Sequence, residues 1–177
     1  MMDQFPLPDA AEYSYSDDWS DTHHGTDIFA SRGQPVLAVS DGTVRATTDP
    51  KGGNVVYLTT PDGWVYYYAH LDAWAPEVEQ GTAPMRVYAG AFLGQVGTTG
   101  NAEGTSPHLH FQAKNPAGET VDPYELLTSV DTHASSGEPA AAQPTKRRSR
   151  SAALAVVGSA LLVAVAGVVI IVARKAK

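Results

Sequence analysis

Short runs of β-branched and aromatic residues, separated by turn-forming residues, dominate the first 130 positions of the chain. The segment PVLAVSDGTVRAT predicts two strands about Asp41-Gly42, and NVVYLTTPDGWVYYYAHL predicts a hairpin that turns at Pro61-Asp62-Gly63. FLGQVGTTG and HLHFQAKN supply two more strand candidates, and only DPYELLTSV looks helical. The pattern therefore predicts a mainly β fold, with one small antiparallel β domain over residues 1–130 and no internal repeat.

Charge is unevenly distributed along the chain. Residues 1–145 contain all 19 Asp and Glu but only five of the 12 Lys and Arg, which is a formal charge of −14. Nucleic acid is therefore not an expected partner of this part. The chain contains no cysteine, which excludes disulfides, thiolate ligands and a cysteine nucleophile. Any metal site must consist of histidine and carboxylate.

The C-terminal part has the character of a membrane anchor. Residues 152–173 are 22 uncharged and mostly apolar residues, enough to cross a hydrocarbon core of roughly 30 Å. We expect a flexible linker at 131–150 that ends in a basic cluster, then one transmembrane helix and a basic tail at 151–177. Four basic residues precede the span and three follow it, so they do not indicate orientation. The first 20 residues show neither a basic segment nor an apolar run, so no secretory signal is expected.

Two histidines lie two residues apart in the strand candidate SPHLHFQA. Because side chains alternate along a strand, we expect His108 and His110 to share one face, with Leu109 and Phe111 on the other. The two imidazoles would then face a common space. A solvated polar face above a hydrophobic core would produce the same pattern.

A third histidine ends the aromatic run WVYYYAHL. On a regular strand His70 would share a face with Tyr68, Tyr66 and Trp64. Such a histidine is either catalytic or a structural residue held by hydrogen bonds, and this segment alone does not distinguish the two.

The segment DTHHGTDIF places two adjacent histidines ahead of an aspartate. Asp27 lies four residues after His23 and three after His24, and the intervening Gly25 favours a bent loop or irregular strand over a helix. A spacing of four keeps His23 and Asp27 on the same side of an extended chain, which favours His23 as a metal ligand.

Taken together, these three segments contain five of the six histidines. Two histidines and one carboxylate leave the fourth tetrahedral position of zinc free for water, which is the arrangement of a catalytic zinc site. Zinc lowers the pKa of such a water and polarises a bound carbonyl, so amide hydrolysis becomes possible at neutral pH. Because the chain has no HExxH motif, a histidine must take the role of its glutamate.

HHGTDIFASRGQPVLAVSDGTV, GNVVYLTTPDGWVYYYAHL and GQVGTTGNAEGTSPHLHF together resemble the lysostaphin-type (LytM-like) zinc metallopeptidases, which hydrolyse bacterial peptidoglycan. The resemblance implies a groove above the sheet and one zinc ion per domain. The family pattern H-x-G-x-D matches His23 and Asp27 as metal ligands, and the second histidine of H-x-H matches His110. It also implies that His70 and His108 are catalytic and activate water or stabilise the tetrahedral intermediate.

The resemblance implies a zinc-dependent metalloendopeptidase that acts on peptide cross-links or stem peptides of peptidoglycan. Family members that have lost metal ligands serve instead as binding modules that activate peptidoglycan amidases, and phage-type lytic enzymes share the chemistry in another role. The complete ligand set favours the enzyme. Because peptidoglycan lies outside the cytoplasmic membrane, we expect the domain to be extracytoplasmic and anchored by a single C-terminal span. The cleaved bond depends on groove loops and stays open at this point.

Overall fold

The computed structural model describes residues 2–79, 81 and 83–133. The predicted transmembrane helix and all of the predicted linker beyond His133 lie outside the described residues. Within the described ranges, no helix has both the length and the apolar character needed to cross a membrane.

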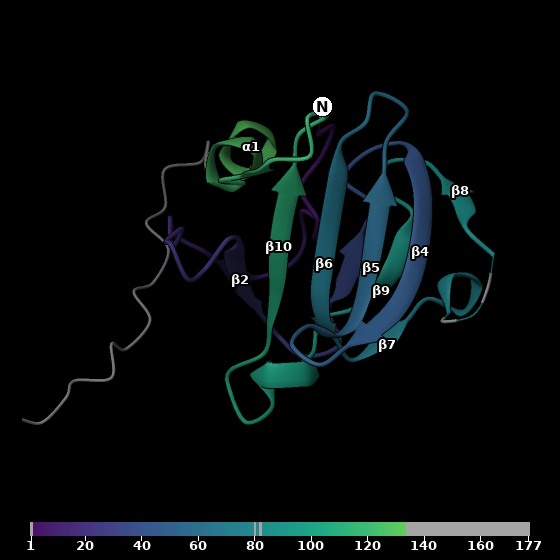
Figure 1. The fold of residues 1–177 in the computed structure, drawn as a ribbon. Helices are drawn as coiled ribbons and strands as arrows, with labels where there is room; N and C mark the ends of the chain where they lie inside the picture. Colours follow the sequence, from purple (N-terminus) through teal and green to yellow (C-terminus); the bar gives the residue numbers. More distant parts are fainter. Residues whose placement is uncertain (1, 80, 82, 134–177) are drawn as a thin grey trace, which may run out of the picture. The chain divides into compact units, whose positions relative to one another are not determined.

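Eight strands form a large antiparallel sheet in the order β1-β2-β10-β6-β5-β4-β8, with β11 paired to β10 (Figure 1). The hairpin predicted at residues 61–63 joins β5 to β6 and is confirmed. The prediction of a mainly β, antiparallel domain is confirmed as well. The strands of this sheet are β1 (Tyr13–Ser14), β2 (Thr26–Ala30), β4 (Gly42–Asp49), β5 (Gly53–Thr59), β6 (Val65–Leu71), β8 (Met85–Val87), β10 (His108–Lys114) and β11 (Thr120–Val121).

A second sheet of three strands lies behind the large one in Figure 1. It consists of β3 (Pro35–Leu37), β9 (Phe92–Gln95) and β7 (Ala73–Trp74), in that order. The two strands predicted about Asp41-Gly42 are therefore present as β3 and β4, but they belong to different sheets and do not pair. A turn signal is local, whereas the choice of partner strand depends on which distant segments are buried together.

The two faces of the large sheet differ in polarity. Tyr66, Tyr68 and Phe111 are fully buried on the face that forms the core. The hydroxyl of Tyr68 accepts a hydrogen bond from the backbone N–H of Val39 at 3.0 Å, which satisfies this polar group inside the core. His110 and the other polar side chains of β10 lie on the opposite face, as the alternation predicted. That face is left open for a site.

Three short helical elements complete the domain: η1 (Pro76–Val78), η2 (Gly100–Ala102) and α1 (Tyr124–Val130). The last confirms the helix predicted in DPYELLTSV, and its Leu127 is buried in the core. Beyond α1, Asp131 is buried and accepts hydrogen bonds from the hydroxyls of Tyr13 and Tyr15 at 2.6 and 2.7 Å. The first residues of the predicted linker are thus packed against β1.

Candidate metal centre

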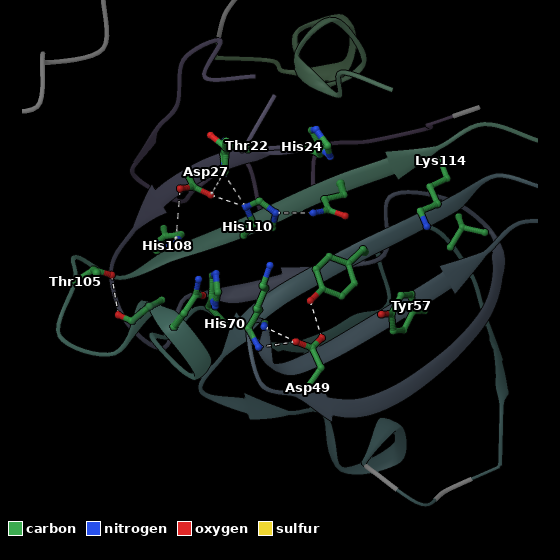
Figure 2. A pocket seen from close by; sticks show the side chains of 18 residues that line it. Thr22, His24, Asp27, Asp49, Tyr57, His70, Thr105, His108, His110 and Lys114 are labelled. Carbon is green, nitrogen blue, oxygen red and sulfur yellow. Dashed lines mark hydrogen bonds and ion pairs between the residues drawn. The ribbon is translucent and has the colours of Figure 1, made fainter. Parts of the chain in front are cut away.

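Three side chains meet on the open face of the large sheet. Asp27 of β2 lies directly opposite His110 of β10, and His23 comes from the turn that precedes β2. Asp27 Oδ1 lies 2.7 Å from His110 Nδ1 (Figure 2). His23 Nε2 lies 3.1 Å from the same oxygen and 3.0 Å from His110 Nδ1. Zinc binds such atoms at about 2.0–2.2 Å, so one ion can reach all three. The structure therefore brings together the three predicted ligands.

The orientation of the histidine rings also suits a bound zinc ion. His23 Nδ1 lies 3.1 Å from the carbonyl oxygen of Asp18. A carbonyl oxygen only accepts, so Nδ1 carries the proton of the neutral ring and Nε2 directs a lone pair at Asp27. In this tautomer the lone pair of His23 Nε2 and the carboxylate oxygen of Asp27, 3.1 Å apart, can both bind one cation. On the other side, Gln112 contacts His110 Nε2 at 2.9 Å and leaves Nδ1 facing the centre.

Gly25, between His23 and Asp27, makes room for the third ligand. A Cβ atom at this position would lie 2.6 Å from His110 Cε1 and 2.8 Å from the carbonyl oxygen of Phe111. Because real Cβ atoms do not approach other atoms so closely, any other residue would displace the His110 ring. The glycine of the motif is therefore a steric requirement of the metal centre.

The charges around the centre keep Asp27 ionised. Burial raises the pKa of this carboxyl, but the hydrogen bond from His110 and the positive charges of His108, His110 and His23 outweigh burial and lower the pKa to about 2. Burial likewise lowers the pKa of His23, but the Asp18 carbonyl and the carboxylates of Asp27 and Asp18 raise it above its ordinary value. Asp27 is thus a carboxylate, the form that binds a metal, at every physiological pH.

Two further histidines stand beside the three candidate ligands. The ring centroid of His70 lies 4.9 Å from that of His108 and 5.8 Å from that of His110. Nδ1 of His70 lies 2.8 Å from the carbonyl oxygen of Thr99, and Nδ1 of His108 lies 2.8 Å from that of Ser106. In its neutral form, each of these rings therefore keeps a lone pair on Nε2. Burial lowers the pKa of His70, which favours its neutral form at pH 7.

The prediction that His70 shares a face with Tyr66 and Tyr68 is wrong. Both tyrosines are buried in the core, whereas His70 lines the groove on the open face together with Tyr67. His70 has a φ of 64°, and within the described ranges it is the only residue other than glycine with a positive φ. The left-handed backbone ends the regular alternation and turns this side chain to the open face. Its N–H donates to the carbonyl oxygen of Gly52 at 2.7 Å.

A groove of about 580 Å³ extends from these histidines across β10, β6 and β5, in agreement with the predicted groove above the sheet. Tyr67 lines it and donates a hydrogen bond from its hydroxyl to Asp49 at 2.8 Å. His24 lies on the rim, where it stacks on Trp19 with centroids 5.3 Å apart, and it is not part of the three-residue cluster.

Sequence reasoning missed the groups that orient the histidines. Three of these groups are backbone carbonyls, those of Asp18, Thr99 and Ser106, and a backbone atom leaves no signal in residue type. Gln112 is different, because it follows His110 by two residues on the same strand. Strand alternation could have placed it beside His110.

Comparison with known proteins identifies relatives of the whole domain. The model of peptidase family M23 matches residues 21–123, which include all five residues of the centre. The L-Ala--D-Glu endopeptidase of Bacillus subtilis (strain 168) is 34% identical over 146 residues, and the match covers 73% of this chain and 44% of that protein. The glycyl-glycine endopeptidase ALE-1 of Staphylococcus capitis is 40% identical over 114 residues, which cover 61% of this chain and 30% of that protein. The chain thus spans less than half the length of either relative.

A solved structure has the same fold. The catalytic domain of the antimicrobial peptidase lysostaphin from Staphylococcus simulans superimposes with a TM-score of 0.53 at 28% identity. The match covers 67% of this chain and 92% of that domain. The similarity therefore extends over nearly all of an isolated peptidase domain.

Proposed function

This chain belongs to peptidase family M23, and from that membership we propose that it is a zinc metalloendopeptidase that hydrolyses peptide bonds in the cross-links or stem peptides of bacterial peptidoglycan. The observation that carries the proposal is the convergence of His23, Asp27 and His110 into one cluster of potential metal ligands. Hydrolysis of an amide bond needs both an electrophilic centre and a base. His70 and His108, whose rings lie beside this cluster, are the candidates for the base.

The geometry of the side chains supports the following roles. His23 Nε2, Asp27 Oδ1 and His110 Nδ1 would hold the ion. When bound, zinc supplies a Lewis acid for the scissile carbonyl and lowers the pKa of a coordinated water. His70 is neutral at pH 7, and its Nε2 can accept the proton of the attacking water and return it to the leaving amine. His108 lies on the same side and, once protonated at Nε2, can donate a hydrogen bond to the oxyanion.

A complete set of these residues supports an enzyme over a non-catalytic module that activates a peptidoglycan amidase. An activator needs a groove that binds its partner, but it needs neither three converging metal ligands nor two neighbouring bases. An ionised carboxylate between two imidazoles, with two further histidines beside it, is the set of groups that metal-dependent hydrolysis of an amide requires.

The proposal is tested with purified peptidoglycan, by measuring new peptide ends with zinc and with a chelator. The variant His110→Ala should lose bound zinc and activity together, whereas His70→Ala should keep zinc and lose about 10²-fold or more in rate. His24→Ala is a matched control, because it removes a groove histidine outside the cluster and should keep zinc and most activity. Equal loss of zinc in His70→Ala and His110→Ala would show that the ligand assignment is wrong. If an intact, zinc-loaded chain releases no new peptide ends, the proposed peptidase activity is wrong.

We also propose that the domain acts outside the cytoplasmic membrane and is tethered there by residues 152–173. Support comes from the length and apolar character of this segment and from the location of peptidoglycan. The basic cluster at 146–150 would then lie near the membrane surface. A reporter that is active only in the cytoplasm, fused to the N-terminus, should be inactive in cells. Activity of that reporter would refute the proposed orientation.

A further inference from the structure

The groove contains two of the few lysines and arginines of a domain that is strongly acidic. Residues 1–145 contain only five Lys and Arg against 19 Asp and Glu. Two of these five, Lys51 and Lys114, line the groove, and the guanidinium of Arg45 lies 5.3 Å from the ring centroid of Tyr57, which lines it as well. Of the other two, Arg32 forms an ion pair with Asp72, and Arg86 lies on β8. Two of the five basic residues of the domain therefore lie where a substrate would bind.

The acidic side chains of the groove do not neutralise these lysines. Asp49 accepts hydrogen bonds from the Tyr67 hydroxyl and from the backbone N–H groups of Lys51 and Gly52. Asp27 contacts His23 and His110 of the metal centre at hydrogen-bond distance. Within the part of the chain that the structure describes, no ion pair joins the ammonium of Lys51 or Lys114 to a carboxylate. Both ammonium groups are thus free to bind a carboxylate from outside the chain.

The two lysines lie at different distances from the reacting centre. Lys114 follows His110 by four residues on β10, which is about 13 Å along the strand. Figure 2 shows it at the opposite end of the groove from His108 and Thr105. Lys51 lies close to the catalytic histidines, because the next residue, Gly52, accepts the hydrogen bond from the His70 N–H. A peptide extended along the groove would pass both.

Resting on the proposed peptidase function, we propose that Lys51 and Lys114 are specificity residues that select peptides with free carboxylates, in preference to uncharged peptides such as glycine bridges. Lys51 would bind a carboxylate beside the scissile bond, and Lys114 one that lies up to about four residues away in an extended peptide. The favoured substrate class is an acidic stem peptide whose carboxyl groups are not amidated. An ion pair between a lysine and a peptide carboxylate favours binding by charge attraction, and this attraction is stronger where the bound peptide excludes water from the groove.

Binding of one peptide in two chemical forms tests the proposal. The probe is a soluble stem peptide that contains glutamate, compared with the same peptide after its carboxylates are converted to carboxamides. Dissociation constants are measured for the full chain carrying His108→Ala, to slow hydrolysis. The acid form should bind about tenfold more tightly, and this preference should shrink about threefold with Lys51→Ala or Lys114→Ala and be lost in the double variant. It should also weaken as the salt concentration rises.

The variant Arg86→Ala is the matched control, because it removes one positive charge from the same domain outside the groove. It should keep the full preference for the acid. Equal binding of the two peptides would overturn the proposal, as would an Arg86→Ala variant that loses as much preference as the lysine variants. In that second case the net charge of the domain would account for the effect.

A parallel cleavage assay separates this proposal from the proposed function. A zinc-loaded chain that prefers the acid peptide through its lysines, but releases no ends from peptidoglycan, would contradict the proposed peptidase activity and support the proposed carboxylate-binding role of the lysines. A chain that cleaves the acid and amidated forms of peptidoglycan at the same rate would support the peptidase and overturn the role of the lysines.

Discussion

At the residue scale, the candidate centre depends on which ring nitrogen each histidine presents. Carbonyl oxygens of Asp18, Thr99 and Ser106 hold Nδ1 of His23, His70 and His108, so these three rings all direct Nε2 toward the groove. Gln112 contacts Nε2 of His110 instead, so this ring directs Nδ1 toward Asp27. With zinc bound to Nδ1, His110 must donate from Nε2, and the carbonyl end of the Gln112 amide would be the acceptor.

Gly25→Ala tests the steric requirement at the metal centre. Its Cβ would lie 2.6 Å from His110 Cε1, so the ring must move away from the other two ligands. We expect zinc affinity to fall about tenfold or more, with little change in the circular dichroism of the folded domain. The metal content after dialysis against a zinc buffer measures the effect. A variant that binds zinc as tightly as the wild type would show that the ring can be accommodated elsewhere.

The low pKa of Asp27 predicts an acid dependence of stability in the metal-free protein. Its folded pKa of about 2 lies below the ordinary value of 3.8, so its contribution is complete above about pH 4 and is lost as pH falls through 2. After allowing for partial exposure, the contribution is about 1–2 kcal/mol. Chemical unfolding in the presence of a chelator should show that the stability difference between wild type and Asp27→Asn shrinks by this amount between pH 5 and pH 2. A stability difference that stays the same from pH 5 to pH 2 would show that the pKa of Asp27 is not lowered in the folded protein.

At the element scale, the end of β6 is shaped by its neighbours more than by its own sequence. His70 takes a positive φ while its N–H bonds to Gly52 in the β4–β5 turn and its ring bonds to the loop before η2. Thr99 joins these elements: its hydroxyl donates to the Leu71 carbonyl and accepts from the Asn54 N–H, at 3.0 and 2.9 Å. The position of His70 is therefore a property of three elements together.

Thr99→Val tests whether this junction positions His70. The substitution keeps the shape of the side chain but leaves the Asn54 N–H and the Leu71 carbonyl without this partner, at a cost of about 1–3 kcal/mol. We expect kcat to fall while bound zinc and KM change little, because the metal ligands lie on other elements. Thr99→Ser keeps the hydroxyl and should restore kcat. Parallel loss of zinc and kcat would indicate general destabilisation of the centre instead.

At the scale of the whole molecule, residues from the two ends of the described chain are joined around Asp131. Its carboxylate accepts from the hydroxyls of Tyr13 and Tyr15, and Tyr13 stacks on Phe5 with centroids 4.5 Å apart. β1 pairs with β2, which carries Asp27. The contacts around Asp131 therefore support the edge of the sheet on which the metal centre is built.

Asp131→Ala should lower the free energy of unfolding by about 2–4 kcal/mol, because two hydrogen bonds to a charged group are lost together. Glu125→Ala is the matched control: it removes an exposed acidic residue from α1 and should change stability by about 0.5 kcal/mol or less. Urea unfolding of both variants provides the comparison. Equal effects would show that the tyrosine contacts of Asp131 do not contribute to stability.

Local patterns in the sequence were sufficient for the strands β5, β6, β9 and β10 and for helix α1, because hydrophobic period and turn residues act over a few positions. They were also sufficient for the shared face of His108 and His110, since a regular strand alternates strictly. The distribution of strands between two sheets did not follow from local pattern. Nothing within PVLAVSDGTVRAT indicates that its two strands pair with different partners.

The sequence by itself determined which residue types are available for chemistry: five histidines and an aspartate in three short motifs, no cysteine, and few positive charges. Only the tertiary structure decided how they act. It turned His70 from the core face to the groove, assigned each imidazole its free nitrogen, and placed Lys51 and Lys114 along one groove. The physical reason is that these properties depend on backbone carbonyls, a left-handed φ and the packing of distant strands, and none of these is carried by residue type.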